Sequence, residues 1–520
     1  MTRGAVLTLT CALLLSGVAR ARTTTYAVSV GNNAVPTETS EVLTKLRFAD
    51  DDAVRMYQLL SQLTDDAVLL ASLDSDSQRR YPGLAAIARP PTWEMLNRTL
   101  ATVAQRVDAD LARGDTPIVY LSFSGHGARA ADGSFFLALE GGQQLTQQRL
   151  YDEVLTPLSS AMVHVLIDAC HAEAIVGTKG AFDREHTMAR VAVSGSEAAN
   201  AFEVRLPERF SRVGLITATT ADQQAHEWSR IESGVFTYEV LSGLSGAADV
   251  NHDGVIEYSE LAAFIASANR DFTDPRAIPA VVALAPRSDV HSPLMRFDAL
   301  RHDGTIEGHF DLGHFFVELE NGLRVVDAHL GAAEVARIRV PAGRAYVVAG
   351  SREAPVALRA NEAIDVGALR FETRGSAARG SVELALTNAF KSPFSREYYQ
   401  GYVDSRREPS VRFEATSVTT APSLTARQAG RWLTAGASAV AGVATLVFAI
   451  EAGLRFESYQ QATFQRPAAE ALSSAYLFLG LSIASAAITT GLALWSWQLT
   501  DDVHVTVAPT GPGVGARVTF

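Results

Sequence analysis

The sequence predicts an α/β fold in which a mostly parallel sheet carries helices on both faces, followed by a small β-sandwich-like domain and a transmembrane helical hairpin. Three observations support this prediction. Short apolar strands alternate with helices over residues 24–275, β-rich segments and turns fill residues 300–415, and two long apolar runs lie near the C-terminus. At 520 residues, the chain is long enough for about three or more folded units.

The composition excludes several classes of protein. The chain is 47% hydrophobic and 20% charged, so it is neither disordered nor collagen-like. The 57 acidic residues outnumber the 45 Lys and Arg residues, and the net charge of −12 argues against nucleic-acid binding, which needs a basic surface. Cys11 lies in a predicted targeting segment, so the mature chain would keep Cys170 alone. One thiol provides neither an intramolecular disulfide nor a multi-cysteine zinc site.

Residues 1–21 have the features of a secretory signal peptide. Arg3 precedes an uncharged apolar run from Ala5 to Ala19, and Ala19-Arg20-Ala21 is an A-x-A cleavage site. A short membrane anchor is the alternative, but this run is shorter than the roughly 20 residues that cross a bilayer. We therefore expect the bulk of the chain to be exported, to a periplasmic or other extracytoplasmic location.

The first folded region, residues 22–295, alternates strands and helices. Strands are expected at Tyr26–Val30, Ala67–Ala71, Pro117–Phe123, Met162–Ile167 and Val213–Ala218. Helices are expected at Leu46–Leu63 and Thr92–Leu111, where apolar residues recur at helical spacing and Thr92 is a candidate N-cap. Sheets of this kind bind ligands beyond the carboxyl ends of their strands.

Two of these strands end in residues with catalytic chemistry. The third strand continues into Ser124-Gly125-His126-Gly127, and the fourth continues into Asp168-Ala169-Cys170-His171. A thiol becomes a good nucleophile when a base takes its proton, and an imidazole can return that proton to a leaving amine. The glycines allow a substrate backbone to approach closely, and their N–H groups suit a developing oxyanion. A buried Cys or a core His alone would be ordinary, but together at two strand ends they predict a Cys-His dyad.

These two motifs resemble those of the caspase superfamily, and most closely its bacterial metacaspase-like branch. Asp51-Asp52-Ala53, on the first predicted helix, resembles the N-D-A element of metacaspases. The resemblance covers about half of the chain and implies a caspase–haemoglobinase fold and hydrolysis of protein or peptide substrates. It also implies that His126 and Cys170 form the dyad, that the Gly127 and Cys170 N–H groups form the oxyanion hole, and that no cofactor is needed for catalysis.

The charge around the predicted nucleophile indicates basic substrates. Asp168 stands two residues before Cys170 and would attract a cationic side chain at the substrate's P1 position. By resemblance, Asp52 adds a second carboxylate to this P1 pocket, so cleavage is expected after Arg or Lys. Two alternatives stay open: Asp168 as a structural cap of its strand, and Arg47 as a reader of a P1 aspartate, the residue that true caspases select.

The segment at residues 177–212 is polar and rich in Gly, Ser and Ala, which suits a linker between two subunits. With a pocket for basic residues, Lys179, Arg184 and Arg190 are candidate self-cleavage positions. A purified Cys170→Ala protein should then stay intact at these positions.

One loop of the same region matches the EF-hand calcium pattern at every defined position, over residues 249–260. The six expected ligands are Asp249, Asn251, Asp253, the carbonyl of Val255, Glu257 and Glu260. Predicted helices at Val235–Leu244 and Leu261–Ala268 flank the loop. We expect Ca²⁺ as a ligand, and the alternative is a loop that keeps this shape without an ion.

The rest of the chain is expected to hold a β-rich domain and a membrane hairpin. Strands are expected at His314–Leu319, Ala336–Val340 and Arg344–Ala349, with turns between them and no catalytic motif. The apolar runs are long enough for membrane spans, and Trp495 and Trp497 suit the interface. The expected order is a β-rich domain (300–415), a linker (416–431), a first span (432–450), a loop (Glu451–Glu470), a second span (472–497) and a tail (498–520). The alternative to the spans is a buried hairpin of a soluble domain.

The sequence departs from the metacaspase pattern at two places. Ala172-Glu173 stands where the family has Ser-Gly after the Cys-His pair, and Asp51 replaces the Asn of N-D-A. The preferred hypothesis is an exported, membrane-tethered cysteine endopeptidase. The first departure keeps open a catalytically silent caspase-like scaffold, and the loop at residues 249–260 keeps open a calcium-sensing envelope protein.

Overall fold

The fold is described from a computed structural model of the chain. It describes residues 22–37, 39, 43–170, 206–219, 227–229, 231–271, 280–331, 335–374, 389–405, 448–459, 469, 471–483, 486, 504–510 and 513–519. The expected signal peptide (1–21), the expected self-cleavage positions and the linker at 416–431 lie outside these residues, as do most of the two expected membrane spans.

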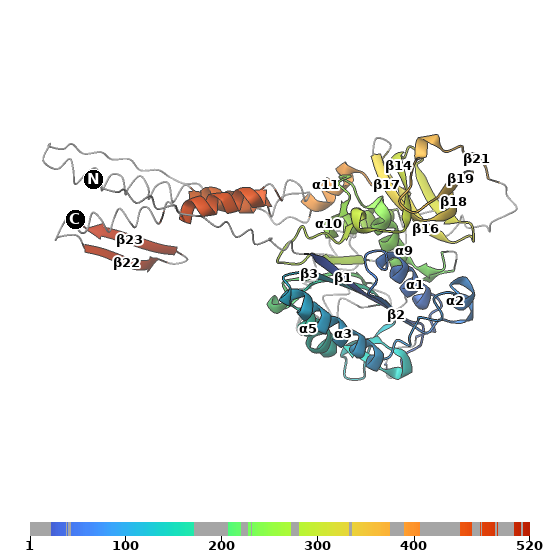
Figure 1. The fold of residues 1–520 in the computed structure, drawn as a ribbon, viewed down its shortest axis with the longest axis horizontal. Coiled ribbons are helices and arrows are strands. Elements are labelled where there is room, and N and C mark those ends of the chain that lie inside the picture. Colours follow the sequence, from blue (N-terminus) through green and yellow to red (C-terminus); the bar gives the residue numbers. More distant parts are fainter. Residues whose placement is uncertain are drawn as a thin grey trace, which may run out of the picture. The chain divides into compact units, whose positions relative to one another are not determined.

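A six-stranded sheet occupies the centre of the first compact unit, with the strand order β12-β8-β7-β3-β1-β2 (Figure 1). Its strands are β1 (Thr23–Asn32), β2 (Ala67–Ala71), β3 (Thr116–Gly125), β7 (Met162–Asp168), β8 (Val213–Thr219) and β12 (Ala280–Leu284). The first five pair in parallel, and β12 pairs antiparallel with β8 at one edge. The prediction of a mostly parallel sheet is therefore confirmed, and all five predicted strands are present.

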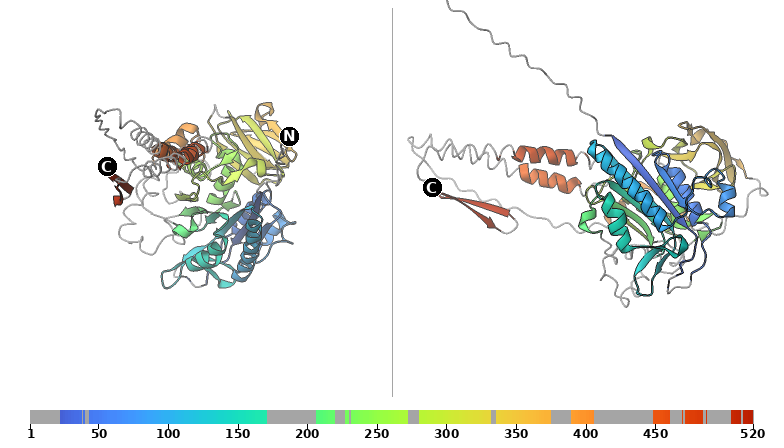
Figure 2. Two further views of the ribbon diagram at one scale, coloured as in Figure 1. Left: turned by 60° about the vertical axis from the view of Figure 1, so that its left-hand side comes forward. Right: turned by 60° about the horizontal axis from the view of Figure 1, so that its bottom comes forward.

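Helices cover both faces of this sheet, as predicted. The longest is α3 (Trp93–Ala112), shown in light blue in Figure 2, which buries Leu96, Leu100, Val103 and Val107 at helical spacing against one face. The Thr92 hydroxyl accepts a hydrogen bond from the Met95 N–H and so caps α3, as its sequence indicates. Further helices are α1 (Ala49–Leu60), α2 (Ser75–Arg80), α4 (Gln147–Arg149), α5 (Thr156–Leu158), α9 (Val235–Ser242) and α10 (Tyr258–Ala268).

Short strands extend the first unit beyond the main sheet. They are β4 (Gly127–Arg129), β5 (Phe135–Ala138) and β6 (Gln144–Thr146) in one small sheet, and the pairs β9 (Glu227–Trp228) with β10 (Ser233–Gly234) and β11 (Val255–Ile256) with β13 (Met295–Arg296). The β4–β5–β6 sheet begins immediately after β3, and β10 leads directly into α9. Residues at both connections belong to the candidate active site.

The predicted β-rich region forms two antiparallel-rich sheets, ordered β16-β15-β18-β19-β21 and β17-β14-β20. The strands are β14 (Asp303–His309), β15 (His314–Leu319), β16 (Arg324–His329), β17 (Val335–Pro341), β18 (Gly343–Ala349), β19 (Arg352–Leu358), β20 (Ala363–Asp365) and β21 (Glu372–Thr373). The sheets approach so closely that a Cβ at Gly304 of β14 would stand 2.7 Å from Leu358 Cβ of β19. This arrangement is sandwich-like, as the strand pattern predicts.

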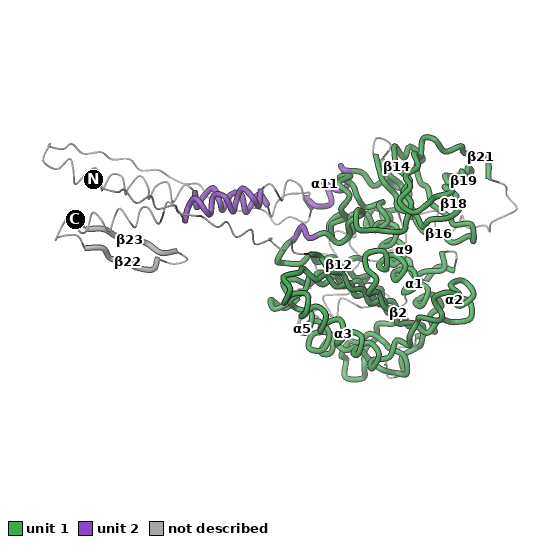
Figure 3. Tube along the Cα trace, in the orientation of Figure 1, with its two compact units in different colours: residues 1–289, 293–395 green, residues 290–292, 396–520 purple. Residues whose placement is uncertain are grey.

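The β-rich strands belong to the same compact unit as the main sheet, which comprises residues 1–289 and 293–395 (Figure 3). The hydroxyl of Tyr238, on α9, donates to the carboxylate of Asp327, on β16, over 3.2 Å, and both side chains are buried. The Asp327 N–H donates to the Ser242 hydroxyl. These buried polar contacts tie the two regions together, so they are not separate compact units as the sequence suggested.

The second compact unit comprises residues 290–292 and 396–520. It contains α11 (Arg396–Asp404), helical residues 448–459 and 471–483, and a hairpin of β22 (His504–Thr510) and β23 (Gly513–Thr519) within the expected tail. The helix at 448–459 continues into residues where the sequence suggested a loop. Within the described residues, no helix combines the length and the apolar character needed to cross a bilayer.

Candidate active site

Strand register brings the two predicted dyad residues to the same edge of the sheet. β3 and β7 pair in parallel, and their last register pair is Ser124 with Asp168. His126 and Cys170 each follow two residues later, beyond the carboxyl ends of these adjacent strands. The backbones remain close after the strands end, because a Cβ placed on Gly127 would stand 2.1 Å from the Cys170 carbonyl oxygen. Only glycine permits this approach.

The imidazole of His126 is held by one ring nitrogen. Its Nε2 lies 2.9 Å from the carbonyl oxygen of Thr44, and because a carbonyl can only accept, Nε2 carries the hydrogen. In the neutral ring, Nδ1 is then the proton acceptor. Burial lowers the pKa of His126, and the hydrogen bond to Thr44 opposes this effect only in part. A neutral imidazole with one basic nitrogen is the protonation state that a general base requires.

The backbone after His126 presents an amide in the manner expected of an oxyanion donor. The Ala138 N–H donates to the His126 carbonyl over 2.8 Å, and Gly127 is the register partner of Leu137. Hydrogen-bonded and non-hydrogen-bonded pairs alternate in an antiparallel ladder. Because His126 and Ala138 are a hydrogen-bonded pair, the next pair, Gly127 and Leu137, is not, and the Gly127 N–H points away from β5. Cys170 itself is buried, at 5% exposure.

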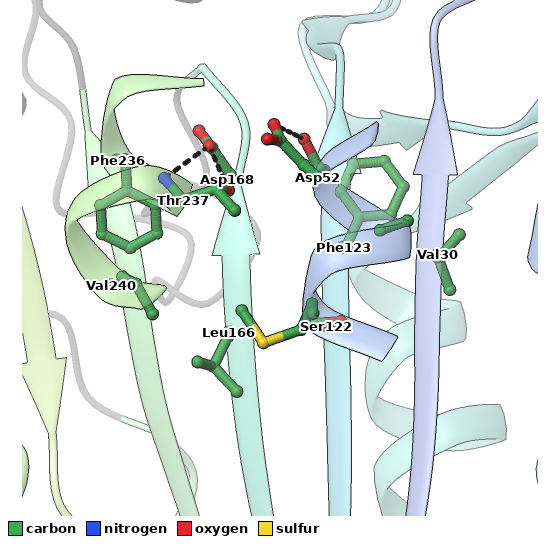
Figure 4. Close-up of a pocket in the computed structure, with 12 residues that line it drawn as sticks. Val30, Asp52, Ser122, Phe123, Leu166, Asp168, Phe236, Thr237 and Val240 are labelled. Atoms are coloured by element: carbon green, nitrogen blue, oxygen red, sulfur yellow. Dashed lines mark hydrogen bonds between the residues drawn. The ribbon is translucent and has the colours of Figure 1, made fainter. Parts of the chain in front are cut away.

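Asp52 and Asp168 meet at the backbone of Gly234, so the two residues predicted for the P1 pocket are together. A Cβ placed on Gly234 would stand 2.6 Å from Asp168 Oδ2 and 3.0 Å from Asp52 Oδ2. Asp52 lies in the first turn of α1 and is 2% exposed, and Asp168 is the last residue of β7. Figure 4 shows both carboxylates at the carboxyl ends of the strands. The site is therefore acidic next to the predicted nucleophile.

The two carboxylates are held by different hydrogen bonds. Asp52 accepts from the Ser124 hydroxyl (3.0 Å), the Ser233 hydroxyl and the Gly234 N–H (3.1 Å). Asp168 accepts from Thr237, through its N–H at 3.1 Å and its hydroxyl at 2.6 Å. Burial, followed by the nearby Asp168 charge, raises the pKa of Asp52 well above its usual range. Burial and the Asp168 charge therefore both favour the protonated form of Asp52.

A small cavity of about 10 Å³ lies beneath these carboxylates and is otherwise mostly apolar, with room for about one water molecule. Val30, Phe123, Leu166, Phe236 and Val240 are among the side chains that line it (Figure 4). This space is too small for an arginine or lysine side chain. A cationic substrate group would have to approach from the outer side of the carboxylates, at the strand ends.

Arg47, the alternative reader of an acidic P1 residue, makes other contacts. Its Nη1 donates to the Ser229 hydroxyl over 3.0 Å, and its backbone N–H donates to the Glu227 carboxylate. The side chain is exposed. Asp52 and Asp168, in contrast, are brought together at the backbone of Gly234.

The loop at residues 249–260 has the turn of the calcium pattern, and its carboxylates bind backbone amides. Asp249 accepts from the Asp253 and Gly254 N–H groups, each over 3.1 Å, and Gly254 adopts φ +82°. Glu260 and Glu257 cap α10 reciprocally, since each side chain accepts from the other's backbone N–H. Among the residues that the structure describes, no three or more His, Cys, Asp or Glu side chains are grouped so as to hold a metal ion.

Four contributors to the site are absent from the sequence-based prediction: Ser233, Gly234, Thr237 and Thr44. The signal for the first three was a Ser-Gly pair immediately before a predicted helix, which is typical of a helix N-terminus and carries no chemistry of its own. Thr44, which orients His126, has no recognisable pattern around it. Ala172-Glu173, the departure beside the nucleophile, lies outside the described residues.

The family model of the caspase domain matches residues 24–283, which is half of the chain. The matched segment contains the main sheet, both predicted dyad residues, both pocket aspartates and the loop at residues 249–260. No curated protein matches the chain.

Proposed function

Because the chain belongs to the caspase-domain family of cysteine peptidases, we propose that it is a metacaspase-like endopeptidase that cleaves after arginine or lysine. The observation that carries this proposal is the register of β3 and β7. In this register Ser124 pairs with Asp168, and His126 and Cys170 each follow two residues later in the chain. The same edge of the sheet carries the acidic pair that would receive a basic P1 residue.

In the proposed mechanism, Nδ1 of His126 takes the Cys170 proton, and the thiolate attacks the carbonyl carbon of the scissile peptide bond. The oxyanion that forms accepts hydrogen bonds from the Gly127 and Cys170 N–H groups. The C–N bond then breaks as His126 returns the proton to the leaving amine. Water, deprotonated by the same imidazole, hydrolyses the thioester and restores the thiol. Throughout, the Thr44 carbonyl keeps Nε2 protonated and the ring oriented.

The acidic pair supports the basic specificity. The carboxylates of Asp52 and Asp168 meet at Gly234, and a carboxylate pairs favourably with a guanidinium or ammonium group. An acidic P1 side chain would be repelled by Asp168. This charge balance is the reason for preferring cleavage after Arg or Lys over a caspase-like preference for Asp.

Active-site labelling tests the proposal. A peptidyl electrophile with a P1 arginine is incubated with the full chain, and mass spectrometry locates the adduct, which should be on Cys170. The Cys170→Ala variant should not be labelled, and His126→Ala should be labelled slowly. A matched control, His309→Ala, replaces an exposed histidine and should behave as the unmodified chain. Labelling by a P1-aspartate reagent alone would contradict the basic specificity, and no labelling by either would favour the silent scaffold.

We also propose that the chain is exported and tethered to the cell-envelope membrane by the apolar runs at 432–450 and 472–497. Support comes from large apolar side chains that are exposed on the described helical residues of this region: Ile450, Leu454, Phe456, Tyr476, Leu477, Leu479, Leu481 and Ile483. Exposed apolar side chains at this density favour a lipid or protein environment over water. Alkaline carbonate extraction of membranes tests this proposal, since release of the chain into the supernatant would contradict it.

Calcium binding at residues 249–260 is a further part of the proposal. It is supported by the complete match to the pattern and by Oε1 of Glu260, which is buried without a hydrogen-bond partner in the structure. Burial raises the pKa of Asp249 to about 6 and that of Glu260 well above its usual range, so a cation would compensate their charge. Calorimetric titration with millimolar Ca²⁺ should give heat that Glu260→Gln removes. Absence of heat in the unmodified chain would contradict this part.

A further inference from the structure

Thr237 binds the carboxylate beside the predicted nucleophile with two donors. Its N–H and its hydroxyl both reach Oδ2 of Asp168, over 3.1 Å and 2.6 Å (Figure 4). Thr237 lies in the first turn of α9, where backbone N–H groups have no partner within the helix and where the helix dipole is positive. The position of Asp168 Oδ2 is thus set jointly by a helix terminus and a side-chain hydroxyl.

Several acidic side chains lie close enough to Asp168 to interact with it electrostatically. They include Asp52 of α1, Glu227 of β9 and Glu239 of α9, and each of these negative charges disfavours the others. The cation Arg55 of α1 interacts with Asp52 and donates a hydrogen bond to the Ile231 carbonyl. The two hydrogen bonds from Thr237 act in the opposite direction to the acidic neighbours, because they favour the ionised carboxylate of Asp168.

We propose that Thr237 is a specificity-determining positioning residue, which holds Asp168 ionised and in place to meet the cation of a P1 side chain. This inference rests on the proposed function. Thr237 acts through Asp168, to which it donates both hydrogen bonds. Its hydroxyl is the part that can be removed alone, because valine has nearly the same shape and keeps the backbone N–H.

The test measures binding, so it does not depend on turnover. The full chain with Cys170→Ala is titrated with a peptide ending in arginine and with the same peptide ending in citrulline, its neutral isostere. The arginine peptide should bind more tightly. Adding Thr237→Val should lower the affinity for the arginine peptide about 10-fold or more, since a hydrogen bond to a charged group is lost. The affinity for the citrulline peptide should change little. The acid limit of arginine binding, meaning the pH below which the arginine peptide no longer binds, should rise by about one pH unit.

Two further variants complete the design. Thr237→Ser keeps the hydroxyl and should restore both the arginine preference and the acid limit. Asp168→Asn keeps Thr237 and should abolish the preference for arginine over citrulline. Equal weakening of both peptides by Thr237→Val, or an unchanged ratio and acid limit, would overturn the inference, as would the absence of an arginine preference in the parent. An unmodified chain that binds arginine without hydrolysis would contradict the proposed function and not this inference.

Discussion

The Cα of Gly127 faces the carbonyl oxygen of Cys170 at a separation that leaves no room for a side chain. A Cβ at this position would stand 2.1 Å from that oxygen and 2.6 Å from the ring of Phe135. The contact joins the turn that follows β3 to the turn that follows β7. It therefore couples the positions of the two residues proposed as the catalytic dyad.

Gly127→Ala should consequently disrupt the site more than a single methyl group would elsewhere. The backbone of one turn must move, which separates His126 from Cys170 and misdirects the Gly127 N–H. We expect peptidase activity to fall about 100-fold or more, on the scale of a lost oxyanion donor. Gly83→Ala is the control, since a Cβ there meets nothing within 4 Å. Equal activity in the two variants would show that the contact is not needed.

Asp52→Asn should remove a pH dependence of stability. The pKa of Asp52 is raised in the folded state, so its contribution to stability is complete below the unfolded pKa near 4 and is lost as the pH rises through the folded pKa. Urea unfolding between pH 4 and 8 should show the unmodified chain losing stability relative to Asp52→Asn, by at most about 1.4 kcal/mol per pH unit. Asp65→Asn, at an exposed position, should follow the unmodified chain.

His164→Gln should improve resistance to acid. His164 is fully buried on β7, its Nδ1 lies 2.6 Å from the Tyr258 hydroxyl, and burial lowers its pKa to about 3. The unfolded chain takes up this proton near pH 6.5, so stability falls with pH below that value. The loss attributable to His164 is on the order of 4 kcal/mol between pH 6.5 and 3.

The measurement for His164 is the free energy of unfolding at several pH values. His164→Gln is expected to be less stable than the unmodified chain at pH 7, because packing is lost, and to decline less steeply toward acid. Replacement of the exposed His309 by Gln is the matched control. Parallel curves for all three proteins would contradict the prediction.

Tyr238→Phe should destabilise the whole first unit. The lost hydroxyl donates to Asp327, a fully buried carboxylate, and removing one donor from such a group costs about 1–3 kcal/mol. Because α9 and β16 belong to one compact unit, unfolding should stay a single transition at a lower temperature. Tyr57→Phe, at a half-buried position on α1, should change little. Separate melting of the β-rich strands would show that the two regions fold independently.

Much of the fold and part of the site could be predicted from local patterns. The five apolar strands and the cap at Thr92 follow from residue type and spacing, which depend on near neighbours in the chain. His126 and Cys170 stood out because both follow strands of a parallel sheet, whose carboxyl ends share an edge. Asp168 could be assigned to the P1 pocket because it stands two residues before Cys170 in the sequence. That the strands after residue 300 share a compact unit with the main sheet could not be predicted from local patterns. Buried polar contacts such as that of Tyr238 with Asp327 link residues 89 positions apart.

The sequence by itself determined the order of strands and helices, the caspase-like motifs and the acidic residue two positions before Cys170. The tertiary structure alone decided the register in which β3 and β7 pair, that Gly127 lies against Cys170, and that Thr237 holds Asp168. The reason is physical: periodicity and capping act within a few residues, whereas register and helix docking depend on side chains that are distant in the chain and compete for the same buried space.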